Sequence, residues 1–216
     1  MRVIGVAGQA RFGKDCLADR LVEKLNVKIQ HKDDLWRRVG FADNVKRVYC
    51  ENFDVTNDFI EEWKVKQEIP VGFDMQVRQS LQFIGDGFRK IRKNIWVDLV
   101  FRDAKPKAIS DVRYPSEFIR VKQEGGLNIL IGRPDKLNDD INESESLIRP
   151  YVDWALAHNE ENVNLLLSEP SRLINSGCPK HMNQFDLFIR NDRTLEDFYE
   201  KIDKMVVPFV EKFNFK

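Results

Sequence analysis

Short apolar runs and longer amphipathic stretches take turns along this chain. The runs are continuous and rich in β-branched residues, as are strands that are buried on both faces of a parallel sheet. We expect four strands of this kind, at residues 2–7, 107–112, 127–131 and 184–189. Two shorter strands are expected at residues 27–30 and 39–41.

The amphipathic stretches carry apolar residues at helical spacing. Leu17, Leu21 and Leu25 are an example, and they predict a helix over residues 14–26. The same pattern predicts further helices at residues 44–52, 58–67, 76–84, 95–102, 116–124 and 194–213. Strands that alternate with helices indicate an α/β fold, with a parallel sheet of about five strands and helices on both faces.

The domain organisation follows from length and pattern. A chain of 216 residues with 42% hydrophobic residues is long enough for one α/β domain with a core of its own. We therefore expect a single domain over residues 1–216, in which about 40–105 form a helical region. Residues of about 135–183 show the least regular pattern and are interpreted as a lid or an insertion.

Charge and cysteine content exclude some classes of function. Lys plus Arg and Asp plus Glu both number 35, so zero net charge gives no general reason to expect binding to nucleic acid or a membrane surface. No apolar run reaches the roughly 18 residues that span a bilayer. Three widely spaced cysteines do not indicate a disulfide framework, so we expect a cytoplasmic protein.

Residues 8–15 (GQARFGKD) match the pattern GxxxxGK between a predicted strand and a predicted helix, which is the context of a phosphate-binding loop. Gly8 and Gly13 allow turns that a Cβ would hinder, and the N–H groups of the loop can then surround phosphate oxygens. Lys14 adds a full positive charge. Asp15 stands where a hydroxyl residue usually holds Mg²⁺; it could ligate the ion, or it could be an ordinary acid at a helix start.

Polar residues follow two other predicted strands. Asp111 and Arg113 come after the strand at 107–112, at the edge where ligands bind in open α/β sheets, and Arg133 comes after the strand at 127–131. An Asp can hold Mg²⁺, and a guanidinium can bind phosphate with two parallel hydrogen bonds. Arg78 and Arg89 are further candidates for an acceptor phosphate. The alternative for each of these residues is a solvated surface position.

At these residues the chain resembles the deoxynucleoside monophosphate kinases of bacteriophages, within the P-loop kinase superfamily. The similar segments occur in the family's order over most of the chain, and they are GQARFGKD (8–15), FADNVK (41–46), VRQSLQFIGDGFR (77–89, with Trp96 after it), SDVRYPSE (110–117), GRP (132–134) and IRNDRTLEDF (189–198). The loop and DVR are shared with dephospho-CoA kinase and phosphomevalonate kinase, whereas the segment at 77–89 is more specific.

The resemblance implies a P-loop kinase three-layer fold and transfer of a phosphoryl group from ATP, with Mg²⁺, to a deoxynucleoside monophosphate. It implies three catalytic residues, namely Lys14, Arg113 and Arg133. The residues that it implies for ATP are Gly8, Arg11, Gly13, Lys14, Asp15, Cys16 and Asn191, with Asn191 near the donor adenine. Those for the acceptor are Lys46, Arg78, Gln82, Asp86, Arg89, Asp111 and Arg113. Asp15 and Asp111 are the expected metal ligands.

Partners and alternatives complete these expectations. The resemblance implies a small nucleotide substrate, a homodimer, and a phage protein in the host cytoplasm, without nucleic-acid or membrane partners. One alternative is a kinase for another small acceptor, such as dephospho-CoA. A second is a non-catalytic nucleotide-binding module or an NTPase switch, and a third, a kinase of nucleic-acid ends, is disfavoured by the zero net charge.

Overall fold

The computed structural model describes residues 1–66, 68–136 and 143–215, which divide into two compact units. The first unit comprises Met1–Val39 and Ala104–Lys216, and it contains the sheet. The second unit is Gly40–Asp103, with bounds close to those of the helical region expected at about 40–105. No helix in the described part of the chain is long and apolar enough to cross a membrane.

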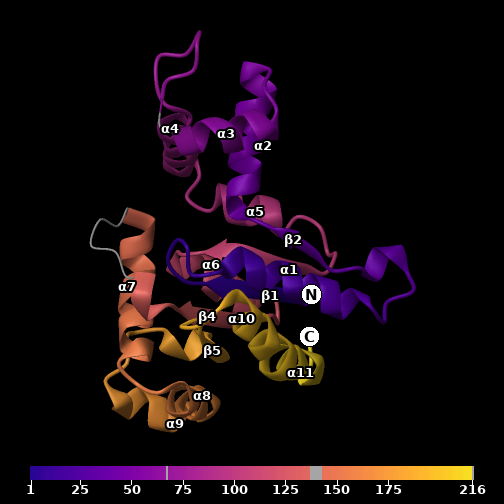
Figure 1. The fold of residues 1–216 in the computed structure, drawn as a ribbon, viewed down its shortest axis with the longest axis vertical. Coiled ribbons are helices and arrows are strands. Elements are labelled where there is room, and N and C mark those ends of the chain that lie inside the picture. The colour runs from indigo at the N-terminus through magenta and orange to yellow at the C-terminus, as the bar shows by residue number, and fades with distance from the viewer. Residues whose placement is uncertain (67, 137–142, 216) are drawn as a thin grey trace. The chain divides into compact units, whose positions relative to one another are not determined.

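A five-stranded sheet forms the centre of the first unit, with every neighbouring pair of strands parallel (Figure 1). The strand order is β2-β3-β1-β4-β5. The strands are β1 (Val3–Ala7), β2 (Arg37–Val39), β3 (Lys107–Val112), β4 (Leu127–Gly132) and β5 (Leu187–Arg190). The central position of β1 places the loop that follows it between the carboxyl ends of β3 and β4.

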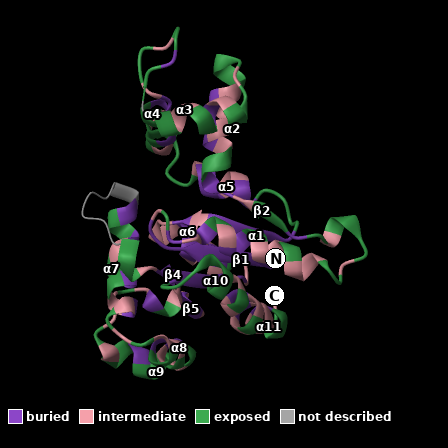
Figure 2. Ribbon diagram, in the orientation of Figure 1, coloured by how far each residue is buried: buried purple, intermediate pink, exposed green. Residues whose placement is uncertain are grey.

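Helices cover the sheet on both faces. All five residues of β1 and all six of β4 are buried, which requires a layer of protein on each side (Figure 2). One layer contains α1 (Lys14–Asn26) and α11 (Val207–Lys212), which contact each other. The other contains α6 (Pro115–Gln123) and α7 (Glu143–Leu156), which meet through the rings of Phe118 and Tyr151. The predicted three-layer α/β fold is confirmed.

The described part of the region at about 135–183 is largely helical and packs on the sheet unit. Helix α7 contacts β4, and α8 (Glu160–Ser168) contacts β5, while α9 (Pro170–Leu173) contacts α8. Residues 137–142 lie outside the described residues, and the role of this region as a lid stays a prediction.

Three local expectations differ from the structure. Residues 27–30 form no strand, and the second strand is Arg37–Val39 instead of 39–41. The predicted closing helix is α10 (Leu195–Lys201) and α11, joined by a π-helical turn at Ile202–Val206. Pro208 has no N–H to donate, so the regular hydrogen-bond pattern of a helix is interrupted at this point.

The second unit is built from α2 (Phe41–Phe53), α3 (Asn57–Lys66), α4 (Val77–Ile91) and α5 (Ile95–Val100). Its small core contains Tyr49, Ile60 and Val77, all fully buried. Aromatic rings pack around them, such as Phe73, whose centroid lies 6.2 Å from that of Tyr49. The indole N–H of Trp96 donates to the Gly85 carbonyl of α4 over 3.0 Å, which fixes α5 against α4.

Candidate functional site

The loop at residues 8–13 has the backbone of a tight phosphate-binding turn. It leaves β1 and enters α1, whose first residue is Lys14. Gly8, Arg11 and Gly13 have φ angles of 153°, 63° and 93°. A Cβ on Gly8 would lie 2.8 Å from the Ile131 carbonyl oxygen, so β4 leaves no room for a side chain there. The N-terminus of α1 contributes unpaired N–H groups and partial positive charge.

Gly13→Ala should destabilise the protein by about 1–3 kcal/mol, because a left-handed backbone strains any other residue. A Cβ here would also lie 2.8 Å from Nδ2 of Asn191. Gly87→Ala is the matched control: Gly87 lies within α4, and a Cβ there meets nothing within 4 Å. The control should stabilise by about 0.5–1 kcal/mol. Denaturant unfolding measures both, and equal effects of the two variants would contradict the assigned loop geometry.

Lys14 is nearly buried, with 7% of its surface exposed, and its Nζ donates to the Gln9 carbonyl over 2.6 Å. Burial, and after it the positive charge of Arg113, lower the pKa of Lys14 from its ordinary value of 10.5 to about 8. The carboxylates of Asp15, Asp111 and Glu145 act in the opposite direction without compensating. The ammonium group therefore stands in a place where a bound anion would relieve an electrostatic cost.

The lowered pKa of Lys14 predicts a pH dependence of stability. Between pH 8 and 10.5 the unfolded chain binds a proton that the folded chain has lost, so the free energy of unfolding should rise with pH. A shift of this size corresponds to about 3 kcal/mol. Denaturant unfolding of the wild type and Lys14→Met across this range should show the rise in the wild type alone. Parallel curves for the two proteins would contradict it.

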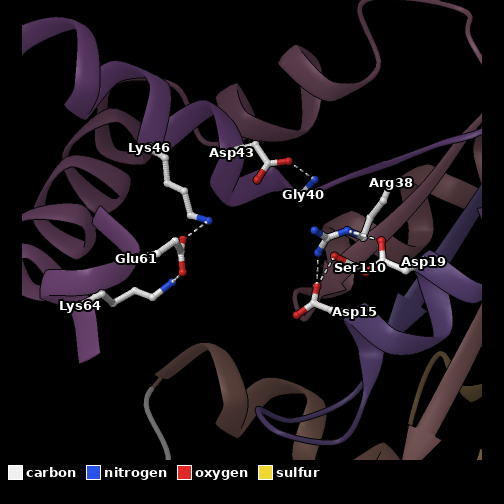
Figure 3. Close-up of polar contacts among 9 residues, drawn as sticks. All are labelled: Asp15, Asp19, Arg38, Gly40, Asp43, Lys46, Glu61, Lys64 and Ser110. Carbon is white, nitrogen blue, oxygen red and sulfur yellow. Dashed lines mark hydrogen bonds and ion pairs between the residues drawn. The ribbon is translucent and has the colours of Figure 1, made fainter. Parts of the chain in front are cut away.

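Asp15 lies in a cluster of charged and polar groups on α1, β2 and β3 (Figure 3). Its Oδ1 accepts hydrogen bonds from Ser110 Oγ and from Arg38 Nη1, both over 2.8 Å. Arg38 Nε also contacts Oδ1 of Asp19 at 2.8 Å. Asp15 itself is largely exposed, with 70% of its side chain accessible. The arrangement places carboxylate and hydroxyl oxygens together at the first turn of α1.

Arg113 is anchored at both its backbone and its side chain. Its N–H donates to Glu117 Oε2 over 2.7 Å, and that carboxylate also accepts the Tyr114 N–H. Its Nη1 donates to Oε1 of Glu145 on α7 over 3.1 Å. Glu145 is almost buried, whereas about a quarter of the Arg113 side chain stays exposed. The guanidinium is thus held in place beside Lys14 with part of its surface open to a ligand.

Asn191 holds the phosphate loop in place through hydrogen bonds. Its Nδ2 donates to the Phe12 carbonyl over 2.9 Å, and its N–H donates to the Gly132 carbonyl over 2.8 Å. A cavity of about 400 Å³ lies beside it, and it is lined mainly by charged residues of the β5–α10 turn and of α10, together with Phe198. Asn191 and Phe198 both line this cavity and both approach Gly13. The cavity therefore adjoins the end of the phosphate loop.

In the second unit, four predicted acceptor residues lie along one side of α4. Positions 78, 82, 86 and 89 are three or four residues apart, so they form one stripe of the helix. These residues, which we call the α4 stripe, are Arg78, Gln82, Asp86 and Arg89. Arg89 Nη1 contacts Asp86 Oδ1 at 3.0 Å. Val77 and Ser80, which are buried, lie on the opposite side.

Lys46, also in the second unit, contacts Glu61 Oε1 at 2.8 Å, and Lys64 contacts the other oxygen of Glu61 (Figure 3). Burial raises the pKa of Glu61, but the hydrogen bonds from Lys46 and Lys64 outweigh it, and the net pKa lies below the usual value. Lys46 and Arg89 thus each supply a cation that is paired with a nearby carboxylate.

The structure brings several predicted site residues of the first unit together. Gly8, Gly13, Lys14, Asp15 and Arg113 surround the start of α1, and Asn191 supports them. Four other predicted residues of the first unit are not seen in this group. Arg11 is exposed, Cys16 and Asp111 are half-buried, and Arg133 pairs with Asp135 through Nε at 3.1 Å. Within the described residues there is no group of three His, Cys, Asp or Glu side chains suited to a metal ion.

The sequence reasoning missed four residues of this site. Arg38 and Ser110 bind Asp15, Glu145 binds Arg113, and Glu117 fixes the turn that carries Arg113. A signal was present for Glu117 alone, since Pro115 and Glu117 match the first helical turn of a capping box.

This chain is similar in sequence to a viral protein over most of its length. A protein of Acanthamoeba polyphaga mimivirus named "Putative deoxynucleotide monophosphate kinase" is 25% identical over 222 aligned positions, which cover 94% of each chain. The chain resembles the deoxynucleotide monophosphate kinases. No model of a protein family matches it. Among solved structures, dephospho-CoA kinase from Campylobacter jejuni aligns over 97% of this chain and 98% of its own, at 13% identity and a TM-score of 0.42. That value is too low to support an argument about function.

Proposed function

We propose that this protein transfers a phosphoryl group from ATP to a deoxynucleoside monophosphate and releases the diphosphate. The observation that carries the proposal is the pair of cations at the phosphate loop. Lys14 is buried, and burial and the nearby charge of Arg113 lower its pKa although three carboxylates act in the opposite direction. Arg113 is held beside it by Glu145 at 3.1 Å. The phosphates of a nucleotide are anions of matching charge and size, and the loop offers backbone N–H groups beside them.

The donor nucleotide is assigned to the first unit. Its phosphates would lie over residues 8–13 and the N-terminus of α1, where Lys14 meets them. The cavity beside Asn191 adjoins the loop at Gly13 and, with about 400 Å³, has room for a purine base. Because the amide of Asn191 already donates to Phe12, its contribution would be to hold the loop and to line this cavity.

Magnesium fits the donor set at Asp15. Mg²⁺ prefers oxygen ligands, keeps several waters, and is usually held by one or two carboxylates together with substrate phosphates. Asp15 with the hydroxyl of Ser110 at 2.8 Å supplies such oxygens, and Asp111 at the end of β3 adds a second carboxylate. These residues would hold the ion, which neutralises charge on the phosphates when it is bound.

The acceptor is assigned to the α4 stripe and Lys46. Two arginines, an amide and a carboxylate on one side of a helix can bind a phosphate and the polar edge of a base. This choice of groups favours a nucleotide over an uncharged alcohol acceptor, and the similarity to the viral protein supports it.

Phosphoryl transfer requires that the two substrates are positioned and that the negative charge on the phosphates is compensated. A monophosphate oxygen is already a competent nucleophile, so no general base is needed. The residues of the loop would orient the transferring group, and Lys14, Arg113 and Arg133 would stabilise negative charge on its oxygens in the transition state.

A coupled assay of ADP release with Mg-ATP tests the proposal. Acceptors are dGMP, dTMP, dCMP, dAMP, their ribose forms and dephospho-CoA, with a no-acceptor control. Turnover that depends on one or more deoxynucleoside monophosphates is expected. Turnover with dephospho-CoA alone would indicate the other kinase class, and release without any acceptor would indicate an NTPase. Phosphorylation of oligonucleotide ends in a parallel assay would indicate a nucleic-acid kinase.

A further inference from the structure

Gln9 is a buried amide without hydrogen-bond partners. Only 2% of its surface is exposed, and neither Oε1 nor Nε2 has a partner. Its backbone carbonyl, in contrast, accepts the hydrogen bond from Lys14 Nζ. Within residues 1–66, 68–136 and 143–215, no other buried side chain has two such atoms. The amide of Asn128, for comparison, donates from Nδ2 to two backbone carbonyls.

An unpaired buried amide lowers the stability of the folded state, and an apolar side chain at the same position would avoid this loss. A primary amide loses its hydrogen bonds to water on burial and regains them only from partners inside the protein. A methionine would occupy a similar volume without any polar atom to satisfy. Such an exception in a native fold indicates a group that acts elsewhere than in folding, or one that a water satisfies.

The place of Gln9 in the fold limits which groups can be the hydrogen-bond partner of its amide. It follows Gly8 at the carboxyl end of the central strand, within the loop to which the phosphates are assigned above. Lys14 Nζ lies 2.6 Å from its backbone oxygen, and Arg113 and Glu145 are near enough to Lys14 to alter its pKa. A phosphoryl group can accept from the amide Nε2, while Oε1 can accept from a cation or a water held by the same phosphate.

We propose that the side-chain amide of Gln9 is a direct contact of the phosphoryl group held by the loop, left unpaired in the free protein and satisfied by the ligand. That this ligand is a nucleoside triphosphate rests on the function proposed above. That the amide lacks a partner is independent of that function. Gln9 would then be a substrate-binding residue beside Lys14 and Arg113.

The proposal predicts opposite changes in stability and activity. Gln9→Met should raise the Tm of the ligand-free protein by about 2–6 °C, because it removes an unsatisfied buried amide. The same variant should lower kcat/KM by about 10- to 100-fold, the size of a lost hydrogen bond to a charged group. Gln9→Leu serves as a second variant, so that the result does not depend on how one side chain packs.

Asn128→Ala is the control for stability without a ligand role. Asn128 lies on β4 and its amide bonds the carbonyls of Phe118 and Gln184, so its loss should lower Tm and leave kcat/KM unchanged. A second readout is the rise in Tm that Mg-ATP causes without acceptor, which should be smaller in both Gln9 variants than in the wild type.

The outcomes separate this inference from the proposed function. If the wild type shows no kinase activity, the proposed function is refuted. The rise in Tm that Mg-ATP causes in the wild type and in the variants still tests whether Gln9 contacts the ligand. Gln9 variants with a lower Tm than the wild type would show that a water or a packing contact satisfies the amide, and they overturn the inference. Variants that keep both the wild-type kcat/KM and the wild-type Mg-ATP shift overturn it as well.

Discussion

Lys14→Met should reduce turnover with Mg-ATP and a deoxynucleoside monophosphate by about 10³-fold or more while the fold stays intact. Charge stabilisation in a site shielded from water is usually the largest contribution to phosphoryl transfer. Lys14 is the most buried cation of this site, at 7% exposure, and it lies at the first position of α1. The stability of the ligand-free protein should not fall, because burial already disfavours the ammonium group and lowers its pKa to about 8.

Lys24→Met is the matched control, since Lys24 lies in the last turn of the same helix and pairs with Asp203 at 3.0 Å. This variant should keep turnover within about twofold, because the pair is a partly exposed ion pair of small energetic value. Steady-state kinetics and circular dichroism measure both variants. A folded Lys14→Met protein with near-normal turnover would refute the role of the loop.

Arg113→Lys should reduce kcat by about 10²–10³-fold, the second-largest effect that we expect. The Arg113 guanidinium is fixed by Glu145 at 3.1 Å, and its backbone is fixed by Glu117 at 2.7 Å. A lysine keeps the charge but cannot form two parallel hydrogen bonds to a phosphate or hold the same contact with Glu145. Loss of one aligned donor in a preorganised site has a cost of this size.

Arg149→Lys gives the comparison for Arg113. Arg149 lies on α7, as Glu145 does, and its Nε contacts Asp153 at 2.7 Å on the surface. Its replacement should leave kcat within about twofold, as expected for an exposed pair. Equal losses in the two variants would mean that Arg113 acts on the fold of this region and not on the phosphates.

Much of the donor site is predictable from sequence because it is contiguous. A strand, the segment at 8–15 and a helix follow one another, and the spacing of Gly8, Gly13 and Lys14 is determined by the loop itself. The α4 stripe is predictable for a similar reason, since positions three and four apart on a helix share a side. In both places short-range geometry decides where the side chains lie.

Contacts between distant segments were not predictable in this way. Arg38 reaches Asp15 because β2 pairs with β3 in a register that sets Arg38 opposite Ala108, two residues before Ser110. Strand β2 has only three residues and is not apolar, so its pattern gives no strand signal of the usual kind. Glu145 lies 32 residues from Arg113, in the region where the hydrophobic pattern is least regular.

The environment of single polar residues was also not predictable from the sequence. In the sequence Gln9 is an ordinary loop residue, and its burial and its unpaired amide are evident only in the folded structure. Asp15 could be an ordinary helix-start acid until Ser110 and Arg38 are seen on its oxygen. The chemistry of the site therefore depends on partners that strand order brings together.

Direct transfer of the terminal phosphate is the measurement that tests the central claim. The protein is incubated with Mg²⁺, ATP labelled in its γ-phosphate, and each of the four deoxynucleoside monophosphates, and the products are separated by chromatography. We expect label in at least one deoxynucleoside diphosphate, in amounts equal to the ADP formed, and none with Lys14→Met. Label found as free phosphate, or retained in ATP with every acceptor, would contradict the account.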